Sequence, residues 1–503
     1  MSVTEPTVKI ATGRVRGHAA GPAGGSVTAF KGIPFAAAPF GADRFLAPRP
    51  PDPWDGTRDA TAFGPRPPQG SLGMVPSSWS SADGLDCLTV NVWTPDAGGS
   101  GLPVMVYLYG GAYMIGSSDQ PDYDGALLAA EGVVVVTFNY RLGMEGFGLV
   151  EGAPPNRALL DQVAALRWVR DNIAAFGGDP AAVTVFGESA GAGSVAALLA
   201  MPSARGLFGR AIIQSLPGPF FTPSFARRAA ETIVGGLGRR PTLDDLAGVA
   251  PEDLLRATDA AMARALNDRA PWGSPAPSAI PFGPVVDGEV LPESPWAAAE
   301  RGATRGVPLI AGYNRDEYRL FMALREQFGT ITEERLAWTM ETLAPAGAES
   351  VYRSGHPDAD LDELYSLVVS DWLFRMPTAH LAAAHARAGG TVHAYELTWP
   401  SPAMGGLLKS CHGLDVPLTF GTLDGWIAMI VFGDGAPPEA EALSRRFRTA
   451  WTAFASTGDP GWPAHEPDGR DLTRVFDVET ADVPGAEAAS RRLWAGHRFD
   501  TLR

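Results

Sequence analysis

Short apolar runs alternate along the chain with longer segments whose apolar residues recur at helical spacing. These runs are rich in β-branched residues and comprise VMVYLY from Val104, VVVVTF from Val133, VTVF from Val183, AIIQS from Ala211 and PLIAG from Pro308. Such alternation is typical of β-α-β units stacked into a mostly parallel sheet. Because the runs are continuously apolar, we expect each to be a central strand covered by helices on both faces.

The segments outside these runs predict the remaining elements. LLDQVAALRWVRDNIAAFGG, from Leu159 to Gly178, has apolar residues at helical spacing and ends in Gly-Gly, which favours a helix end. Near the amino terminus, TVKIATGRVRG and SVTAFKGIPFA predict short hairpin strands beside a proline-rich stretch. Residues 222–280 and 320–390 are predicted to be helix-rich insertions. Since no repeat or long linker divides the chain, residues 1–503 are interpreted as one domain.

Composition and charge narrow the function classes. The chain has 503 residues, of which 45% are hydrophobic and 19% charged, as in an ordinary globular protein. Its net charge of −16 repels nucleic-acid phosphates, so we expect no nucleic-acid partner. None of the lysines, Lys9, Lys31 and Lys409, follows a glycine, which excludes the G-K-[ST] end of a phosphate-binding loop.

Two features of the sequence favour a cytoplasmic location. The segment MSVTEPTVKIATGRVRG contains Glu5 and Lys9 but no long apolar run, so it does not resemble a secretory signal. The longest uncharged stretch, AGGSGLPVMVYLYGGAYMIGSS, is interrupted by Pro103 and by glycines, which favours a buried strand and loop over a membrane span. In the cytoplasm we expect both cysteines, Cys87 and Cys411, to be reduced.

A strand, a tight turn and a helix follow one another around Ser189, because VTVF leads into GESAGAGS and then VAALLA. A G-x-S-x-G turn in this context holds its serine in a strained conformation, and Gly187, Ala190 and Gly191 must be small to avoid neighbouring strands. The serine is then exposed at a helix N-terminus, with the Ala190 N–H directed toward a developing oxyanion. The pentapeptide alone is a weak signal in a chain with 59 glycines, so the prediction depends on the flanking strand and helix.

Three further segments supply the groups that a serine nucleophile needs. After an earlier strand, YLYGGAYMIG offers Gly111 and Ala112 as backbone N–H donors for an oxyanion. His412 is the expected base, because CHGLDVPLTFG follows the late predicted strand TVHAYELTW, and the other histidines are interpreted as structural. PLIAGYNRDEY places Asp316 and Glu317 after another strand, and the spacing leaves both open as the acid. The order serine, acid, histidine is that of the α/β-hydrolase fold.

With their surroundings, these residues resemble the type-B carboxylesterase and cholinesterase family over nearly the whole chain. The matching segments are GIPFAAAPFGADRFLAPRPPDPWDG from Gly32, DCLTVNVWTP from Asp86, NYRLGMEGF from Asn139, DQVAALRWVRDNIAAFGGDPAAVTVFGESAGAGS from Asp161, FGPVVDGEVLP from Phe282 and WTAFASTGDP from Trp451. The resemblance implies an α/β-hydrolase fold with helical insertions over the site, and a serine carboxylesterase that forms an acyl-enzyme without a cofactor or metal. It also implies that the acid is Glu317, matching the family's D-E-G glutamate, and that the base is His412, since HGLD matches H-G-x-E.

Three residues depart from the family pattern. Tyr109 replaces the histidine of H-G-G-[GA], Leu85 replaces an acidic residue before D-C-L, and Tyr318 replaces the glycine after the glutamate. The animal relatives pair the cysteine of D-C-L with an upstream cysteine, but none precedes Cys87 here. That disulfide bridge is therefore absent.

The sequence constrains the substrate and the partners less closely. Tyr113, Phe220, Phe221 and Phe282 lie near the motif segments and are predicted to line an apolar acyl or alcohol pocket. We expect a small-molecule ester as substrate, no membrane contact, and a monomer or homodimer. The alternatives are a non-catalytic binding protein of the same fold, a hydrolase of a narrow carbamate, amide or lactone substrate, and chemistry at the Cys411 thiol.

Overall fold

The computed structural model describes most of the chain, namely residues 6–21, 27–71, 79–264, 272–273, 277, 280–499 and 501–502. Parts of three predicted segments lie outside the described residues. These parts are residues 1–5 of the amino-terminal segment, Ser26 of the second hairpin segment, and residues 265–271, 274–276 and 278–279 of the first helical insertion.

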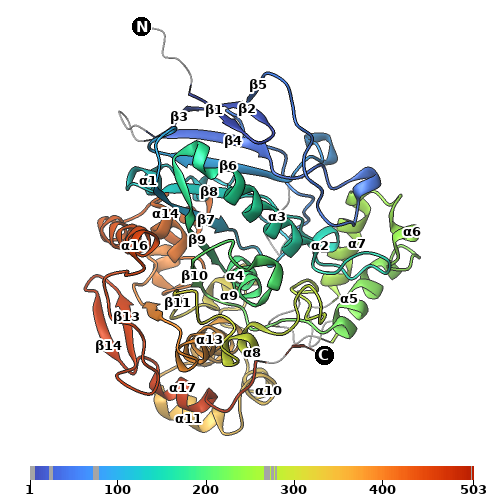
Figure 1. The fold of residues 1–503 in the computed structure, drawn as a ribbon. Coiled ribbons are helices and arrows are strands. Elements are labelled where there is room, and N and C mark those ends of the chain that lie inside the picture. The colour runs from blue at the N-terminus through green and yellow to red at the C-terminus, as the bar shows by residue number, and fades with distance from the viewer. Residues whose placement is uncertain are drawn as a thin grey trace.

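A mixed sheet of eleven strands runs through the molecule (Figure 1). Its strands are β3 (His18–Ala19), β4 (Thr28–Pro34), β6 (Thr89–Thr94), β7 (Leu102–Leu108), β8 (Val134–Phe138), β9 (Gly178–Glu188), β10 (Arg210–Gln214), β11 (Leu309–Asn314), β12 (Val392–Leu397), β13 (Leu472–Phe476) and β14 (Ala481–Pro484). They lie in the order β14-β13-β12-β11-β10-β9-β7-β8-β6-β4-β3. Neighbours from β8 to β13 are parallel, and the pairs toward both edges are antiparallel. The five predicted central strands are confirmed as β7, β8, β9, β10 and β11.

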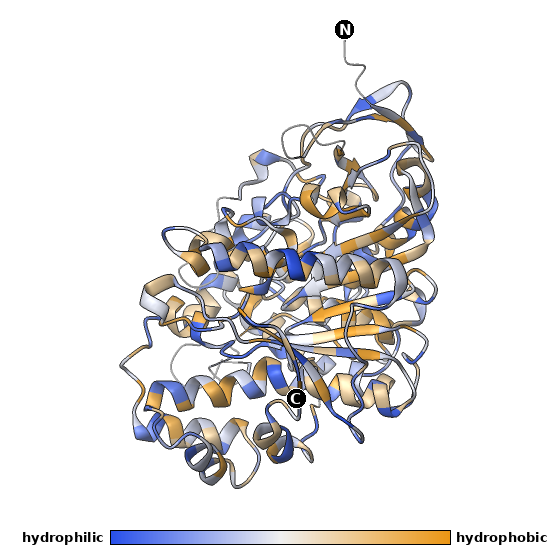
Figure 2. Cartoon of the chain, turned by 90° about the vertical axis from the view of Figure 1, so that its left-hand side faces the viewer, coloured by the Kyte–Doolittle hydropathy of each residue, from blue (hydrophilic) through white to orange (hydrophobic). Residues whose placement is uncertain are grey.

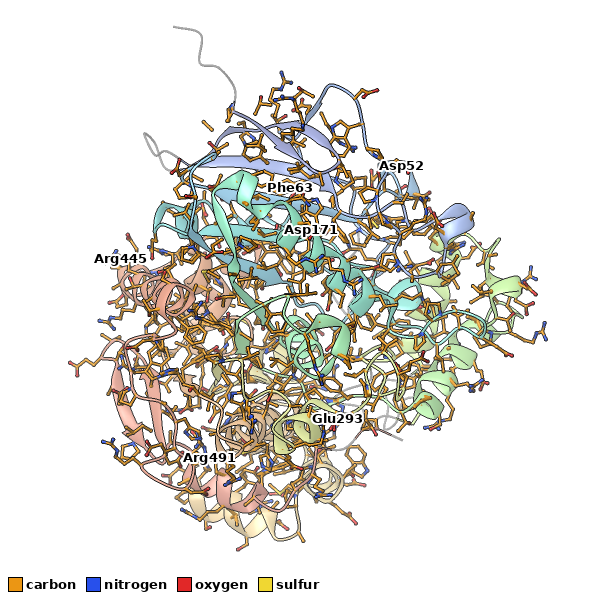
Figure 3. All side chains as sticks on the ribbon, viewed as in Figure 1. Asp52, Phe63, Asp171, Glu293, Arg445 and Arg491 are labelled. Atoms are coloured by element: carbon orange, nitrogen blue, oxygen red, sulfur yellow. The ribbon has the colours of Figure 1, made fainter. Side chains whose placement is uncertain are left out.

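The centre of the sheet forms the core of the protein. Every residue of β8, β11 and β12 is buried, as their nearly continuous apolar sequences predict. Figure 2 shows these central strands mainly in the colours of apolar residues. Side chains fill the space between the sheet and the surrounding helices, as Figure 3 shows.

Helices cover both faces of the sheet. On one face, α3 (Arg157–Asn172), α4 (Ala190–Ala200), α8 (Pro295–Glu300) and α13 (Met376–Arg387) follow one another in contact, and on the other face lie α1 (Ala126–Ala130), α14 (Asp415–Phe420) and α16 (Pro438–Thr457). Other short helices are α2 (Gly143–Gly146), α15 (Trp426–Phe432) and α17 (Ala488–Trp494). Among the described residues, no helix combines the length and the apolar character that a bilayer crossing needs.

The helix predicted from Leu159 to Gly178 is shorter than expected at its carboxyl end. It ends as α3 at Asn172 and continues as a single 3-10 turn, η4 (Ile173–Phe176). Gly177 then adopts a left-handed conformation with φ of 85°, and Gly178 already begins β9. The first glycine therefore ends the helix as predicted, whereas the second belongs to the next strand.

The amino-terminal region and the insertions also follow the predictions. β1 (Thr7–Ile10) and β2 (Gly13–Arg16) form a hairpin that β5 (Thr57–Asp59) extends, while β4 pairs with β3 and β6. The insertions contain α5 (Pro223–Gly235), α6 (Leu243–Leu246), α7 (Pro251–Ala263), α9 (Arg319–Leu324), α10 (Glu333–Leu343), α11 (Ala348–Gly355), α12 (Leu361–Ser370) and a π-helical turn, η7 (Asp371–Arg375). Isolated 3-10 turns are η1 (Gly41–Asp43), η2 (Ser81–Asp83), η3 (Pro121–Tyr123), η5 (Pro202–Ala204) and η8 (Ala403–Gly406).

A buried ion pair fastens α3 to the loop after β8. Arg141 and Asp161 are both fully buried, and their side chains meet through Nη2–Oδ1 at 2.7 Å and Nε–Oδ2 at 2.8 Å. The Arg141 Nη1 group also donates to the carbonyl oxygen of Leu46 at 2.8 Å. Removing one partner of such a pair would leave an uncompensated buried charge.

Candidate active site

Ser189 occupies a sharp turn between β9 and α4. Its backbone has φ of 56° and ψ of −125°, a conformation that a non-glycine residue rarely adopts. A Cβ atom on Gly191 would lie 1.9 Å from the carbonyl oxygen of Leu108, and one on Gly187 would lie 2.6 Å from the backbone of Gly191. The turn can therefore form only because these two positions carry no side chain.

His412 links Ser189 to a buried carboxylate. The Ser189 hydroxyl donates to His412 Nε2 at 2.8 Å, and His412 Nδ1 donates to Glu317 Oε2 at 2.5 Å. The structure thus brings together three sequence-predicted residues from the carboxyl ends of β9 and β11 and from the loop before α14. This arrangement allows the imidazole to accept a proton from the serine while the carboxylate stabilises the resulting positive charge.

The Glu317 carboxylate is held in one orientation by two donors. Its Oε1 accepts from the Ser215 hydroxyl at 2.5 Å and from the Asn314 backbone N–H at 2.8 Å. These bonds leave Oε2 facing the histidine. The neighbouring Asp316 instead accepts from the Ser410 backbone N–H at 3.3 Å, so the two acidic side chains that the spacing left open have different partners.

Aromatic rings and a backbone contact fix the position of His412. Phe374, from the π-helical turn η7, stacks on its ring at 4.3 Å with an interplanar angle of 27°, and Phe321 of α9 lies 5.1 Å away. The Asn314 side chain donates to the carbonyl oxygen of Cys411 at 2.8 Å.

The Cys411 thiol is buried, and burial raises its pKa. The raised pKa disfavours the thiolate that chemistry at this residue would need.

Glu188 adds a second carboxylate beside the histidine. Its Oε1 lies 3.1 Å from His412 Nε2, the same nitrogen that faces Ser189. Burial raises the pKa of Glu188 to about 8. Burial by itself lowers the pKa of His412, but the carboxylates of Glu188 and Glu317 outweigh it and raise that pKa to about 9. The two carboxylates therefore stabilise the imidazolium that arises when His412 accepts a proton.

The loop after β7 brings backbone N–H groups to Ser189. Gly111, Ala112 and Tyr113 all have positive φ values, of 114°, 55° and 61°. Gly111, Ala112 and Ala190 line the same cavity as Ser189, and their N–H groups make no hydrogen bond within the described part of the chain. These groups can thus donate to a bound oxyanion.

Tyr109 anchors this loop from behind. Its ring stacks on that of Tyr140 at 4.4 Å with an interplanar angle of 18°, and the Tyr140 hydroxyl donates to the Tyr109 carbonyl oxygen at 2.6 Å. Both rings are buried. The family's histidine is thus replaced by an aromatic pair that holds the start of the loop, whereas Leu85, another departure, is half-buried and does not line the cavity.

A cavity of about 540 Å³ opens over Ser189 and His412. Of the residues predicted for the substrate pocket, Tyr113, Phe221 and Phe282 line it. Phe220 is not among the lining residues, since its ring packs edge-on against Trp296 at 5.4 Å. Adjacent residues of an extended segment point in opposite directions, so one phenylalanine faces the cavity and the other faces the core.

Three residues that contact the site, Glu188, Ser215 and Phe374, were not predicted from the sequence. Ser215 ends the predicted strand AIIQS and Glu188 ends β9, two residues beyond the predicted strand VTVF. This position at the carboxyl edge of a parallel sheet is a signal that could have singled them out. No sequence signal marks Phe374, because its position depends on the π-helical turn. Within the residues that the structure describes, no cluster of three or more His, Cys, Asp or Glu side chains forms a possible metal site.

Comparisons with known proteins agree with the fold. The sequence pattern of the carboxylesterase family matches residues 4–471. The para-nitrobenzyl esterase of Bacillus subtilis (strain 168) is 39% identical, over 92% of this chain and 94% of that protein. The fumonisin B1 esterase of Sphingopyxis macrogoltabida is 36% identical, over 92% of this chain and 86% of that protein.

Solved structures show the same relationship. A carboxylesterase of Geobacillus stearothermophilus superimposes with a TM-score of 0.84 at 36% identity, covering 97% of this chain and 99% of that chain. The resemblance recognised from the sequence motifs is thereby confirmed. The chain belongs to the carboxylesterase family and is a hydrolase of carboxylic esters with the α/β-hydrolase fold.

Proposed function

We propose that this esterase acts through Ser189 as nucleophile, His412 as general base and Glu317 as the residue that orients the base. The observation that supports these roles is the continuous chain of hydrogen bonds from the Ser189 hydroxyl through both imidazole nitrogens to the Glu317 carboxylate. A serine hydroxyl is a weak nucleophile until a base removes its proton. The geometry supplies that base at 2.8 Å.

The reaction proceeds in two acyl-transfer steps. His412 takes the Ser189 proton as the serine oxygen attacks the ester carbonyl, and the tetrahedral intermediate collapses when the imidazolium protonates the leaving alcohol. Water activated by the same imidazole then attacks the acyl-enzyme and releases the acid. Glu317 and Glu188 both stabilise the imidazolium that forms in each step, since both carboxylates lie within 3.1 Å of its nitrogens.

The N–H groups of Gly111, Ala112 and Ala190 bind the oxyanion. They line the cavity beside Ser189, and their positive-φ backbone and the helix N-terminus hold them in place before substrate arrives. In comparable enzymes one such donor contributes about 3 kcal/mol to transition-state stabilisation.

The substrates are carboxylic esters with apolar acyl or alcohol groups. Tyr113, Phe221 and Phe282 line a cavity of about 540 Å³, within the usual size range for small-molecule sites. The names of the relatives, para-nitrobenzyl esterase and fumonisin B1 esterase, also favour ester substrates.

We also propose that residues 1–503 form one domain that works in the cytoplasm as a monomer or homodimer, without a nucleic-acid partner. The net charge of −16 supports the absence of a nucleic-acid partner. Cys87 and Cys411 are free thiols, as expected in a reducing compartment.

A panel of 4-nitrophenyl esters, from acetate to long acyl chains, tests the proposed function. Ser189→Ala should lower kcat by about four to six orders of magnitude without unfolding the protein. Ser203→Ala is a matched control, because this exposed serine lies just beyond the same helix, α4. Turnover retained by Ser189→Ala would refute the nucleophile, and no turnover of any ester by the wild type would favour a non-catalytic protein or a narrow carbamate, amide or lactone substrate.

A further inference from the structure

One wall of the catalytic cavity carries positive charge. The lining side chains are mainly apolar, and the charged ones among the described residues are Glu188, His412, Arg325 and Arg335. The first two belong to the catalytic centre. The two arginines have no part in the proposed acyl transfer, and they form a cationic wall in a protein whose net charge is −16.

Arg325 lies one helical turn from Phe321, a residue whose ring packs beside His412. It follows α9 directly and comes four residues after Phe321, whose ring lies 5.1 Å from that of His412. Residues four apart on a helix share a face and are separated by about 6 Å. Arg325 lines the same cavity as Ser189 and His412.

Tyr318 holds Arg325 in this position. The Arg325 Nη1 group donates to the Tyr318 hydroxyl at 2.9 Å, and the Tyr318 ring is fully buried against Phe321 and Tyr365. Burial raises the pKa of the Tyr318 hydroxyl, so it accepts this bond as a neutral group. The family resemblance predicts a glycine at position 318. Since glycine has no hydroxyl, the bond to Arg325 depends on the tyrosine of this chain.

Arg335 extends the cationic wall of the cavity. Its guanidinium lies 5.8 Å from the ring centre of Tyr365 and, in the part of the chain that the structure describes, has no ion-pair or hydrogen-bond acceptor. Glu333 lies two residues before Arg335, but its carboxylate pairs with Arg353 instead. The Arg335 Nε group is buried without an acceptor, a condition that costs free energy unless a ligand supplies one.

We infer that the cavity takes esters that carry a carboxylate at the end remote from the scissile bond, and that Arg335 and Arg325 bind this carboxylate. A guanidinium presents paired N–H donors that match the two oxygens of a carboxylate. The other lining side chains of the cavity are mainly apolar, which suits a methylene chain. The inference rests on the proposed function, because it places one end of the substrate at Ser189.

The inference is tested by comparing two series of esters. One series is the mono-4-nitrophenyl esters of dicarboxylic acids, from succinate to suberate, and the other is the 4-nitrophenyl alkanoates of the same chain lengths. For each length, the ratio of kcat/KM on the anionic ester to kcat/KM on the neutral ester is the readout. In the wild type we expect this ratio to reach about 10 at the best length, which corresponds to about 1.4 kcal/mol. Arg335→Met should lower the ratio about tenfold, mainly through KM for the anionic ester, and Arg335→Lys should restore part of it.

Arg445→Met is the matched control. Arg445 projects from α16 at the left margin of Figure 3, where it pairs with Glu441 at 3.0 Å, and its loss changes the net charge by the same amount. The control should keep the wild-type ratio. A wild-type ratio near 1 at every length, or an unchanged ratio in both Arg335→Met and Arg335→Gln, would overturn the inference while leaving the esterase proposal intact. No turnover of either ester series would instead overturn the proposed function.

Discussion

Two adjacent carboxylates follow β11, and removing the charge of each should affect esterase activity to very different extents. Glu317 faces His412 Nδ1 at 2.5 Å, whereas Asp316 accepts only from the Ser410 backbone N–H at 3.3 Å among the described residues. The substitutions Glu317→Gln and Asp316→Asn each replace one carboxylate oxygen by an NH2 group with almost no change in volume. They therefore separate the chemistry of the two positions from packing effects.

The hydrogen bonds of Glu317 determine how a glutamine would be oriented. Its carbonyl oxygen must take the place of Oε1 to keep the donors Ser215 and Asn314, so its NH2 group faces His412. That NH2 group donates to Nδ1, which forces the imidazole proton onto Nε2. The nitrogen that faces Ser189 can then no longer accept the serine proton. A wrong tautomer of this kind lowers kcat by about 10⁴-fold in serine proteases, equivalent to about 5.4 kcal/mol.

Asp316→Asn should have little effect by comparison. An asparagine oxygen can still accept from the Ser410 backbone N–H, and no reacting group depends on the charge. We expect kcat/KM to stay within about threefold of the wild type. The assay is kcat/KM for 4-nitrophenyl butyrate, with the thermal unfolding midpoint measured for each variant. A larger loss in Asp316→Asn than in Glu317→Gln would refute the assignment, as would more than a tenth of wild-type activity in Glu317→Gln.

Four other predictions concern the pH profile and stability. Since the neutral imidazole is the base and the pKa of His412 is raised above its ordinary 6.5, kcat/KM should fall as pH falls through a midpoint above 6.5. Glu188→Gln removes one of the attractions that raise this pKa, so the midpoint should move to lower pH; a shift to higher pH would contradict the electrostatic reasoning. Gly191→Ala should destabilise the protein by about 3 kcal/mol or more, because its Cβ would lie 1.9 Å from a carbonyl oxygen of β7, and an unchanged urea midpoint would exclude that clash. Asp161→Asn should cost about 3–5 kcal/mol by leaving Arg141 buried without its charge partner, and the same urea titration checks this.

Much of the fold follows from local sequence patterns. The continuously apolar runs predict the central strands, because a strand covered by helices on both faces needs apolar side chains in both directions. The strand, turn and helix around Ser189 are local as well, and the small residues beside it satisfy a backbone constraint that acts over a few residues. The boundary at Gly178 was less predictable, because whether a second glycine ends a helix or begins a strand depends on the strand that it pairs with.

The three residues of the hydrogen-bonded chain at the site come from distant parts of the sequence. Ser189 and His412 are 223 positions apart, and Glu317 and His412 are 95 positions apart. Strand order and the family resemblance were enough to select them. The spacing by itself did not separate Glu317 from Asp316, since that choice depends on which side chain the donors Ser215 and Asn314 turn toward the histidine.

What the sequence by itself determined is the sheet, the nucleophilic turn and the family. Only the tertiary structure placed Glu188 and Phe374 against His412, turned Phe221 toward the cavity and Phe220 away from it, and put Arg335 in the cavity wall, where its Nε group has no acceptor among the described residues. The physical reason is that strand and turn preferences act between covalent neighbours. The charges and rings around an active site, by contrast, are set by the packing of elements that the chain brings together from far apart.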